Sequence, residues 1–388
     1  MMVSMKTADV IIIGGGLIGC AIARSLAKEN LSVMVLDKQQ PGLEASRAAA
    51  GMLSPQSETD SPDQFFRLCM ASRDLYSDFA AAISEESGVD VEYRTDGTVV
   101  LAFNEDQAQV LVGRAAWQQA EGLNVEVLSA EDACVMSPAI TPEIQSALFV
   151  PDDHQINNRK LTSAVTIAAA RAGAEIRTGH PVDQILSKGN RATGLRVNGQ
   201  QIECGTIINA AGCWAGLIES VIRPSTIPVR GQMIALRSSS PIVDHVIHTP
   251  GCYIVPRLDG RIIIGSTTEH AGFDKSNTAA GVTGLLSAAV EAVPDFAQLP
   301  IDEMWAGLRP GTLDGLPLLG RAESSGVENL IFATGHYKNG ILLTPITALL
   351  ITEMIMGGNI PPTHQKWLRE FRPDRFTAST ADSLVGTR

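Results

Sequence analysis

The pattern of apolar and polar residues predicts a βαβ unit at the start of the chain. An apolar run at Asp9–Ile13 is followed by a glycine-rich turn, a helical stretch at Cys20–Glu29 and a second apolar run at Leu31–Leu36. Short runs rich in Ile and Val predict buried strands, and the longer periodic stretch between them predicts a helix. A strand, a glycine turn, a helix and a strand in this order are typical of dinucleotide-binding folds.

Predicted helices and strands continue to alternate along the rest of the chain, which indicates a mixed α/β protein. Helical periodicity predicts helices at Ser61–Ser87, Glu105–Glu121, Ser129–Met136, Arg159–Ala172, Gly281–Val293 and Ile341–Met356. Short apolar or alternating runs predict strands at Val91–Tyr93, Thr98–Phe103, Leu148–Val150, Glu175–Arg177, Val182–Leu186, Ala192–Val197, Gln201–Ile208 and Asn329–Ala333, with more between Val229 and Gly265.

The composition adds that the protein is globular and acidic. The 388 residues are 45% hydrophobic and 19% charged, which suffices for a large core and for two or three domains. The formal net charge of −12 repels phosphate backbones, so a general nucleic-acid binder is not expected. Positive charge that serves function is therefore expected to be local, as one or two Arg or Lys residues held in a pocket.

The cysteines and the apolar segments favour a cytoplasmic protein. Six cysteines are scattered without CxxC spacing, which indicates a reduced protein with no zinc or other metal site. The stretch Val10–Ala23 also resembles a secretion signal, but cleavage there would destroy the glycine-rich turn, so we favour the turn. The apolar run at Ile341–Met356 contains Pro345 and Glu353 and is short for a bilayer, so it predicts a buried helix and no membrane insertion.

The glycine-rich turn, Gly14-Gly15-Gly16-Leu17-Ile18-Gly19, has the spacing of a dinucleotide site. Gly14 allows a tight turn, Gly16 lets the backbone approach a pyrophosphate, and Gly19 allows the helix to pack closely on the strand. The helix N-terminus offers partial positive charge to a phosphate, and Asp37 can accept hydrogen bonds from a ribose. A glycine turn that binds nothing is the alternative, and the motif alone leaves NAD and FAD open.

Two further segments favour FAD, an extended cofactor that contacts its protein along its whole length. Ala45-Ser46-Arg47-Ala48-Ala49-Ala50-Gly51-Met52 offers small side chains that let main-chain N–H groups press against a ligand, although the run also fits a short Ala-rich helix. The turn Gly335–Gly340 opens another helix near the far end of the chain, and that helix N-terminus can face a distant part of the same cofactor.

Several segments in this order resemble the family of FAD-dependent amine and D-amino-acid oxidases along essentially the whole chain. They are Val10–Gly19, Ser46–Met52, Asn209–Trp214, Trp305–Thr312 and Gly335–Leu343. Within the family the sequence is most similar to the glycine oxidases of thiamine biosynthesis, through Tyr253–Arg257, Gly265–Thr267, His270–Lys275 and Trp305–Gly311. The resemblance implies oxidation of glycine or another small amine to an imine that hydrolyses to glyoxylate, with O₂ reduced to H₂O₂.

The resemblance also implies an α/β (α+β) architecture. A Rossmann-like FAD-binding domain would be assembled from residues 6–55, 150–228 and 305–375. A discontinuous substrate domain, built on a mainly antiparallel sheet, would comprise residues 56–149 and 229–304, and residues 377–388 would form a flexible tail. The partners implied are a small amino-acid substrate and O₂, with a homo-oligomer suggested by relatives alone.

The resemblance assigns a set of residues to the cofactor. With the glycine turn, the expected contacts are Gly14, Gly15, Gly16, Leu17, Ile18, Gly19, Asp37, Lys38, Ala45, Ser46, Ala49, Ala50, Gly51, Met52, Val182, Gly212, His336, Tyr337, Lys338, Asn339, Gly340, Ile341 and Leu342. Val182 would reach the adenine end, and residues 336–342 would wrap the isoalloxazine ring. Some relatives attach FAD through a cysteine after the substrate arginine, but Pro310–Gly320 contains none, so we expect non-covalent FAD.

The resemblance further assigns Arg309 to the substrate carboxylate and places Tyr253 over the substrate. A guanidinium can grip a carboxylate with two parallel hydrogen bonds. The residues alone leave open an interdomain salt bridge for Arg309, a core position for Tyr253 and surface exposure for Lys338. Related enzymes often carry Arg where Lys338 stands, and Lys keeps the charge without the planar fork. Lys338 could also stabilise the reduced flavin, whereas His336 is expected to have no acid–base role.

Two other functions compete with an oxidase. A dehydrogenase of the same family would use sarcosine, D-amino acids or proline-like substrates and pass electrons to a quinone, and we find no basic amphipathic helix for the membrane surface it would need. A flavoprotein that only binds or senses a ligand is the other alternative, and the presence of Arg309 argues against it.

Overall fold

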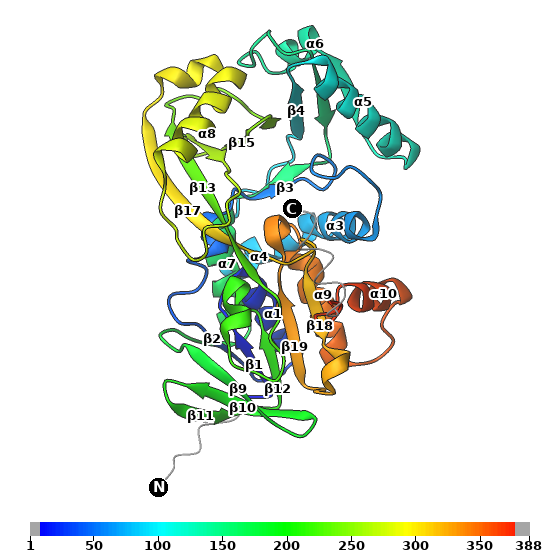
Figure 1. Cartoon of the computed structure of the whole chain (residues 1–388), viewed down its shortest axis with the longest axis vertical. Helices are drawn as coiled ribbons and strands as arrows, with labels where there is room; N and C mark the ends of the chain where they lie inside the picture. Colours follow the sequence, from blue (N-terminus) through cyan, green and yellow to red (C-terminus); the bar gives the residue numbers. More distant parts are fainter. Residues whose placement is uncertain (1–7, 377–388) are drawn as a thin grey trace.

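The computed structural model describes residues 8–376 and contains two large sheets, one above the other in Figure 1. The lower sheet has six strands, in the order β18 (Leu318–Arg321), β19 (Leu330–Thr334), β12 (Thr206–Asn209), β1 (Val10–Ile13), β2 (Val33–Leu36) and β8 (Glu175–Arg177). Neighbouring strands are parallel except β18 and β19, which are antiparallel. The tail predicted at residues 377–388 lies outside the described residues.

Strand β1 shows why the centre of this sheet is apolar throughout. Val10 and Ile12 are buried in the core on one face, and Ile11 and Ile13 are buried in the core on the other. Successive side chains of a strand point to opposite faces, so a strand covered on both sides is apolar at every position.

Helices cover one face of the six-stranded sheet and a small sheet covers the other. The helices are α1 (Leu17–Lys28), α3 (Gln64–Asp74), α4 (Tyr76–Ser87), α7 (Asn158–Arg171), α9 (Thr344–Met356) and α10 (Pro362–Glu370). The small sheet consists of β9 (Val182–Lys188), β10 (Arg191–Val197) and β11 (Gln200–Glu203), at the bottom of Figure 1.

The upper sheet has eight strands and is mainly antiparallel. Its order is β17 (Ile301–Gly311), β13 (Ile227–Arg237), β16 (Arg261–Gly265), β15 (Cys252–Pro256), β14 (Val246–Thr249), β4 (Thr98–Ala102), β6 (Ser146–Val150) and β5 (Glu126–Ser129). Helix α8 (Ala279–Ala292) packs on this sheet, and α5 (Glu105–Ala120) and α6 (Ala130–Met136) lie beside β4–β6 (Figure 1).

Short elements lie between the two halves. They are α2 (Ala45–Ala48), the pair β3 (Met52–Leu53) and β7 (His154–Gln155), and the 3₁₀ turns η1 (Gly212–Leu217) and η4 (Tyr337–Asn339). Two further 3₁₀ turns lie within the halves: η2 (Pro294–Gln298) follows α8 in the upper half, and η3 (Glu323–Ser325) connects β18 and β19 in the lower half. The predicted fold class, a Rossmann-like sheet with a mainly antiparallel second sheet, is confirmed. No helix in residues 8–376 is long and apolar enough to cross a bilayer.

Some predicted elements differ from those in the structure. The helix predicted at Ser61–Ser87 is two helices, α3 and α4, and the strand predicted at Val91–Tyr93 is irregular. Both helices fall in the segment 56–149 assigned to the substrate domain. They pack instead into the core on the helix-covered face of the six-stranded sheet, where Tyr76 is fully buried and donates a hydrogen bond to Ile341 O at 2.8 Å. Strand β17 crosses the proposed boundary at 305, since it pairs with β13 over nearly its whole length.

Candidate active site

A cavity of about 920 Å³ lies where the carboxyl ends of the parallel strands meet the upper sheet. Ile13, Leu36, Ala210 and Thr334 line it at or just beyond the ends of β1, β2, β12 and β19. This edge of an open α/β sheet is where ligands generally bind. The volume is at the upper end for small-ligand pockets, which suits an extended ligand together with a second, small one.

The glycine turn forms one wall of the cavity and leaves no room for side chains. Gly14 has a φ of +103°, and a Cβ on it would stand 2.5 Å from Ala210 O. A Cβ on Gly19 would collide with Gly14 O, so the glycine lets α1 start directly against the turn. Gly16, by contrast, faces open space with only Ser46 Oγ within reach, so a ligand can approach its backbone.

Polar groups surround the same end of the cavity. Asp37 accepts hydrogen bonds from the N–H groups of Gly15, at 2.7 Å, and Gln39, at 2.8 Å. Burial raises the pKa of this carboxyl, and the hydrogen bonds partly oppose the shift. Lys38 places its Nζ 3.5 Å from the centroid of the Trp214 ring, in a cation–π contact.

The Ala-rich segment is both a short helix and part of the cavity wall. Helix α2 occupies Ala45–Ala48, and Ser46 Oγ accepts a hydrogen bond from Leu17 N at 3.0 Å. The upper sheet presses closely on this helix, because a Cβ on Gly307 would collide with Ala48 Cβ. The two interpretations of this segment are therefore compatible.

Most of the residues assigned to the cofactor from the sequence line this cavity. They are Gly14, Gly16, Leu17, Ile18, Asp37, Lys38, Ala45, Ser46, Ala49, Ala50, Gly51, Met52, Val182, Gly212, His336, Tyr337, Lys338, Asn339, Gly340 and Ile341. Gly15, Gly19 and Leu342 do not line it. Gly15 and Gly19 are buried behind the turn, and Leu342 is buried in the core, where its carbonyl accepts a hydrogen bond from Ser72 Oγ at 2.6 Å.

The helix that follows the turn Gly335–Gly340 begins later than predicted. Helix α9 begins at Thr344 and not at Ile341, with Pro345 in its first turn, where a missing N–H has no cost. His336 is buried and its Nε2 lies 3.1 Å from Thr347 Oγ1. Burial lowers the pKa of His336 to about 3, so the ring is neutral near pH 7.

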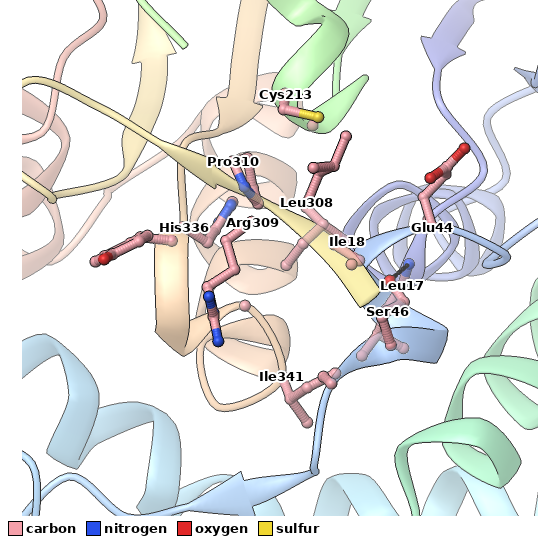
Figure 2. Close-up of a pocket in the computed structure, with 18 of the residues that line it drawn as sticks. Leu17, Ile18, Glu44, Ser46, Cys213, Leu308, Arg309, Pro310, His336 and Ile341 are labelled. Atoms are coloured by element: carbon pink, nitrogen blue, oxygen red, sulfur yellow. Dashed lines mark hydrogen bonds between the residues drawn. The ribbon is translucent and has the colours of Figure 1, made fainter. Parts of the chain in front are cut away.

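Arg309 projects from β17 into the other end of the cavity (Figure 2). Its Nη1 donates to Thr267 O at 3.1 Å and Arg230 O at 3.4 Å, and its Nη2 donates to Ser266 Oγ. The guanidinium lies flat against β13 because a Cβ on Gly231 would collide with it. Within residues 8–376 it makes no salt bridge, so the interdomain salt bridge considered for it is absent, although Glu58 and Tyr253 are close enough to interact with it electrostatically.

Tyr253 and Lys338 line the same end. Tyr253 is half-buried and its hydroxyl donates to Met233 Sδ at 3.3 Å. Burial raises the pKa of this hydroxyl, with Arg309 acting in the opposite direction, so it is protonated at neutral pH. Lys338 is accessible from the cavity, with its Nζ 5.5 Å from the Tyr337 ring centroid.

Sequence analysis missed several residues at this end. Gly231, Ser266, Glu58 and His248 all line the cavity. The segment Gly265–Thr267 already stood out in the resemblance, so Ser266 could have been found there. Nothing in the sequence near Glu58 or His248 signals a site, because the fold alone brings them beside Arg309. No group of three or more His, Cys, Asp or Glu in the described part of the chain is placed to hold a metal ion.

Comparison with known proteins places this geometry in a family. The FAD dependent oxidoreductase family (DAO) matches residues 9–354, which is most of the chain.

The chain belongs to this family.

Individual relatives show which members of the family the chain resembles. Glycine oxidase of Geobacillus kaustophilus is 35% identical over 89% of this chain and 92% of its own length. Its crystal structure superposes with a TM-score of 0.90, at 33% identity, over 96% of this chain and 100% of that one. The predicted family and the predicted likeness to glycine oxidases are confirmed.

Two other relatives show how far the likeness extends. The bifunctional protein ThiO/ThiG of Synechocystis is 34% identical over 98% of this chain, which spans only 56% of that relative's length. Hydrogen cyanide synthase subunit HcnC of Pseudomonas aeruginosa is 31% identical over 97% of this chain and 99% of its own length. The chain is thus similar to relatives that carry different names.

As a member of this family the protein is an FAD-dependent oxidoreductase, and its cavity fits FAD. A side chain on Gly16 would enter the open space beside the turn, and α1 begins directly after this glycine, so the positive end of the helix lies at the cavity. When FAD is bound, Asp37 and Val182 would hold its nucleotide end, and the turn 336–341 would border its ring.

Proposed function

We propose that the protein is an oxidase that converts glycine, or another small amino acid, to the imine with reduction of O₂ to H₂O₂. The imine hydrolyses to glyoxylate when glycine is the substrate. We further propose that the protein serves thiamine biosynthesis in the cytoplasm, as its likeness to ThiO and glycine oxidase suggests. The likeness to HcnC supports a small amine substrate of the same kind but leaves the identity of that amine to experiment.

One observation carries this proposal. Arg309 makes no salt bridge among residues 8–376 and lines the same cavity as the residues assigned to FAD, and backbone carbonyls and Ser266 fix its position. A guanidinium whose remaining N–H groups face a cavity binds a carboxylate strongly and with defined orientation. An amino acid held by its carboxylate there lies at the flavin end of the site.

The chain's own residues bind and orient the substrate. FAD, when bound, supplies the redox chemistry by accepting a hydride from the substrate Cα and passing the electrons to O₂. Arg309 holds the carboxylate, Tyr253 lies beside it and limits the space, and the cavity removes water from around the amine. No side chain has to take a proton from carbon, so orientation is the main contribution of the protein.

We also propose that FAD is bound without a covalent link. Cys213 and Cys252 line the cavity, but burial raises the pKa of each thiol to about 12, so neither is an available nucleophile. Acid precipitation should release all of the yellow cofactor into the supernatant. Colour that stays in the protein pellet would contradict this proposal.

The decisive experiment is a substrate panel with glycine, sarcosine, D-alanine and D-proline. We expect glycine or a similarly small member to bleach the flavin in the absence of O₂ and to produce peroxide in air. Bleaching without peroxide, but with electron transfer to a quinone, would replace the oxidase by a dehydrogenase. A flavin that no member bleaches would refute the proposed function.

A further inference from the structure

We propose that Glu58 binds the amino group of the substrate and thereby selects amino acids over carboxylic acids that lack an amine. This inference rests on the proposed function, because it concerns the same cavity. It adds a second charge to the site, opposite in sign to Arg309.

The turn that carries Glu58 is fixed by a buried polar network. Gln56 N and Ser57 N donate to the carboxylate of Asp153, at 3.2 and 2.7 Å, and Ser57 Oγ donates to it at 2.6 Å. Arg114 Nη1 donates to Ser57 O at 2.5 Å. Gln56, Ser57 and Asp153 are buried. The backbone beside Glu58 is therefore held from several directions, as expected for a ligand-binding position.

The Glu58 carboxylate itself has no partner in the described part of the chain. It makes no hydrogen bond and no salt bridge there, although Arg114 is close enough to bond Ser57 O and Asp60 instead. The side chain is exposed and lines the cavity. Desolvation by the surrounding protein atoms raises the pKa of Glu58, and the positive charges of Lys338, Arg309 and Arg114 oppose the shift.

The charges of the cavity form a pattern that matches a zwitterion. Arg309 and Glu58 line the same end but lie too far apart to form a salt bridge with each other. Of the other acidic residues that line the cavity, Asp37, Glu44 and Asp183 all lie at the nucleotide end. A ligand with a carboxylate and an ammonium group can satisfy both Arg309 and Glu58, and a plain carboxylic acid satisfies only one.

Two more polar atoms support a polar ligand at this end. Ser54 Oγ and His248 Nε2 are buried at residues that line the cavity, and neither has a hydrogen-bond partner within residues 8–376. Buried polar atoms in folded proteins are normally paired, so such atoms in a cavity indicate a ligand that carries polar groups.

The test compares ligands with and without an amine on the FAD-loaded protein. Glycine affinity is measured as the half-saturating concentration for anaerobic flavin reduction, and acetate and glycolate affinities are measured from the flavin absorbance change on binding. In Glu58→Gln we expect glycine affinity to fall by about tenfold or more, because the ammonium group loses its charged partner in the cavity. We expect acetate to bind equally well or up to about fivefold more tightly, because a negative charge has left the cavity.

Two further variants separate charge from structure. Glu58→Asp keeps the charge and should recover part of the glycine affinity. Asp60→Asn removes a charge from a solvent-exposed residue that does not line the cavity, and both affinities should stay at the wild-type level. The melting temperature of Glu58→Gln should not fall, because its carboxylate has no protein partner to lose.

The outcomes distinguish this inference from the proposed function. If no amino acid reduces the wild-type flavin, the proposed function fails and this inference fails with it. If the wild type is reduced by glycine, or by another amino acid used with its own deaminated analogue, the sign of the two changes decides. Equal weakening of both ligands in Glu58→Gln, or no change in either, would overturn the role of Glu58 alone.

Discussion

Two arginines, one in the upper sheet and one directly after its strand β15, differ in how their hydrogen bonds are satisfied. At the junction of the two halves, Arg257 is buried and its two Nη atoms donate to Ile156 O, Ala50 O, Asn158 Oδ1 and Gln155 Oε1. At the end of the cavity, Arg309 lines the open space, and its hydrogen bonds to Thr267 O, Arg230 O and Ser266 Oγ account for three of its four Nη hydrogens. Neither has a carboxylate partner among the described residues.

The difference separates a structural role from a binding role. The acceptors around Arg257 use every Nη hydrogen, so no ligand can be added, and the side chain ties β15 to the segments around Ala50 and Ile156. Burial lowers the pKa of Arg257 to about 10, so it remains charged at neutral pH. The acceptors around Arg309 orient the guanidinium without completing its hydrogen bonds. The number of unused N–H groups therefore distinguishes the two roles better than burial or charge.

The largest expected effect is that of Arg309→Ala on substrate binding. Loss of a charged hydrogen-bonding partner in a desolvated site costs about 2–5 kcal/mol, so affinity for glycine and acetate should fall by roughly 30- to 5000-fold. The free energy of unfolding should change by less than about 1 kcal/mol, because no protein carboxylate loses its partner. Flavin titration and urea denaturation measure the two quantities.

Arg237→Ala is a suitable control, since Arg237 is an exposed residue of the same sheet that pairs with Asp302. It should leave ligand affinity unchanged. An Arg309→Ala protein that binds acetate normally would remove the basis of the proposed function.

Arg257→Met should show the opposite pattern. Removing the guanidinium leaves several buried acceptors, including Ala50 O and Ile156 O, without donors. The free energy of unfolding should fall by about 2–4 kcal/mol. Substrate affinity of the FAD-loaded protein should change by less than about threefold, because Arg257 does not line the cavity. Strongly weakened substrate binding at unchanged stability would show that the comparison of the two arginines is wrong.

Gly231→Ala tests whether the space beside Arg309 matters. The added Cβ would collide with the guanidinium, and relief of such overpacking costs about 1–3 kcal/mol. We expect substrate affinity to fall by roughly 5- to 150-fold, through displacement of Arg309. Gly113→Ala, on a helix with open space around the position, should leave affinity unchanged. Normal substrate binding in Gly231→Ala would mean that the guanidinium is not held against β13.

The smallest effect concerns an arginine whose charge is fully paired. Arg24 of α1 and Lys28 bind Glu86 of α4 and lower the pKa of that carboxyl from 4.5 to about 2, mainly through the Arg24 hydrogen bond. The unfolded chain binds the proton more readily, so this stabilisation is present above pH 4.5 and is lost as the pH falls toward 2. Because Glu86 is partly exposed, we expect about 1–2 kcal/mol at pH 7.

Urea denaturation of Glu86→Gln and wild type checks this expectation. The difference in unfolding free energy should shrink steadily between pH 5 and pH 3, with ligand affinity unaffected. A difference that stays constant with pH would show that the pair contributes by packing and not by charge.

The sequence predicted the nucleotide end of the cavity better than the substrate end. The turn at Gly14–Gly19 and the segment at Ala45–Met52 are each one continuous stretch of sequence. In the turn, close backbone contacts at Gly14 and Gly19 require glycine. At the substrate end, Glu58, His248 and Arg309 come from distant parts of the chain, and only the folded sheets bring them together. The position of Arg309 was suggested by resemblance, but its lack of a salt bridge could only be seen in the structure.

In the fold as well, elements with a local signal were predicted, and the packing of distant segments was missed. The strands β1, β2 and β19 were predicted because each is a short apolar run, whereas the strand predicted at Gln201–Ile208 is divided between β11 and β12, which belong to different sheets. The placement of α3 and α4 was missed because helical periodicity identifies an apolar face without saying which sheet will cover it. Domain boundaries placed by resemblance are subject to the same uncertainty of packing, as β17 at residue 305 shows.

The facing glycines Gly231 and Gly307 on β13 and β17 have a practical consequence for redesign. Gly231 leaves space for the Arg309 guanidinium and Gly307 leaves space for α2, so each glycine matters because it has no side chain. A library that seeks new substrates should vary positions whose side chains line the cavity, such as Tyr253 and His248, and keep both glycines fixed. Substitutions at residues 231 and 307 would mostly give variants with displaced Arg309 or α2.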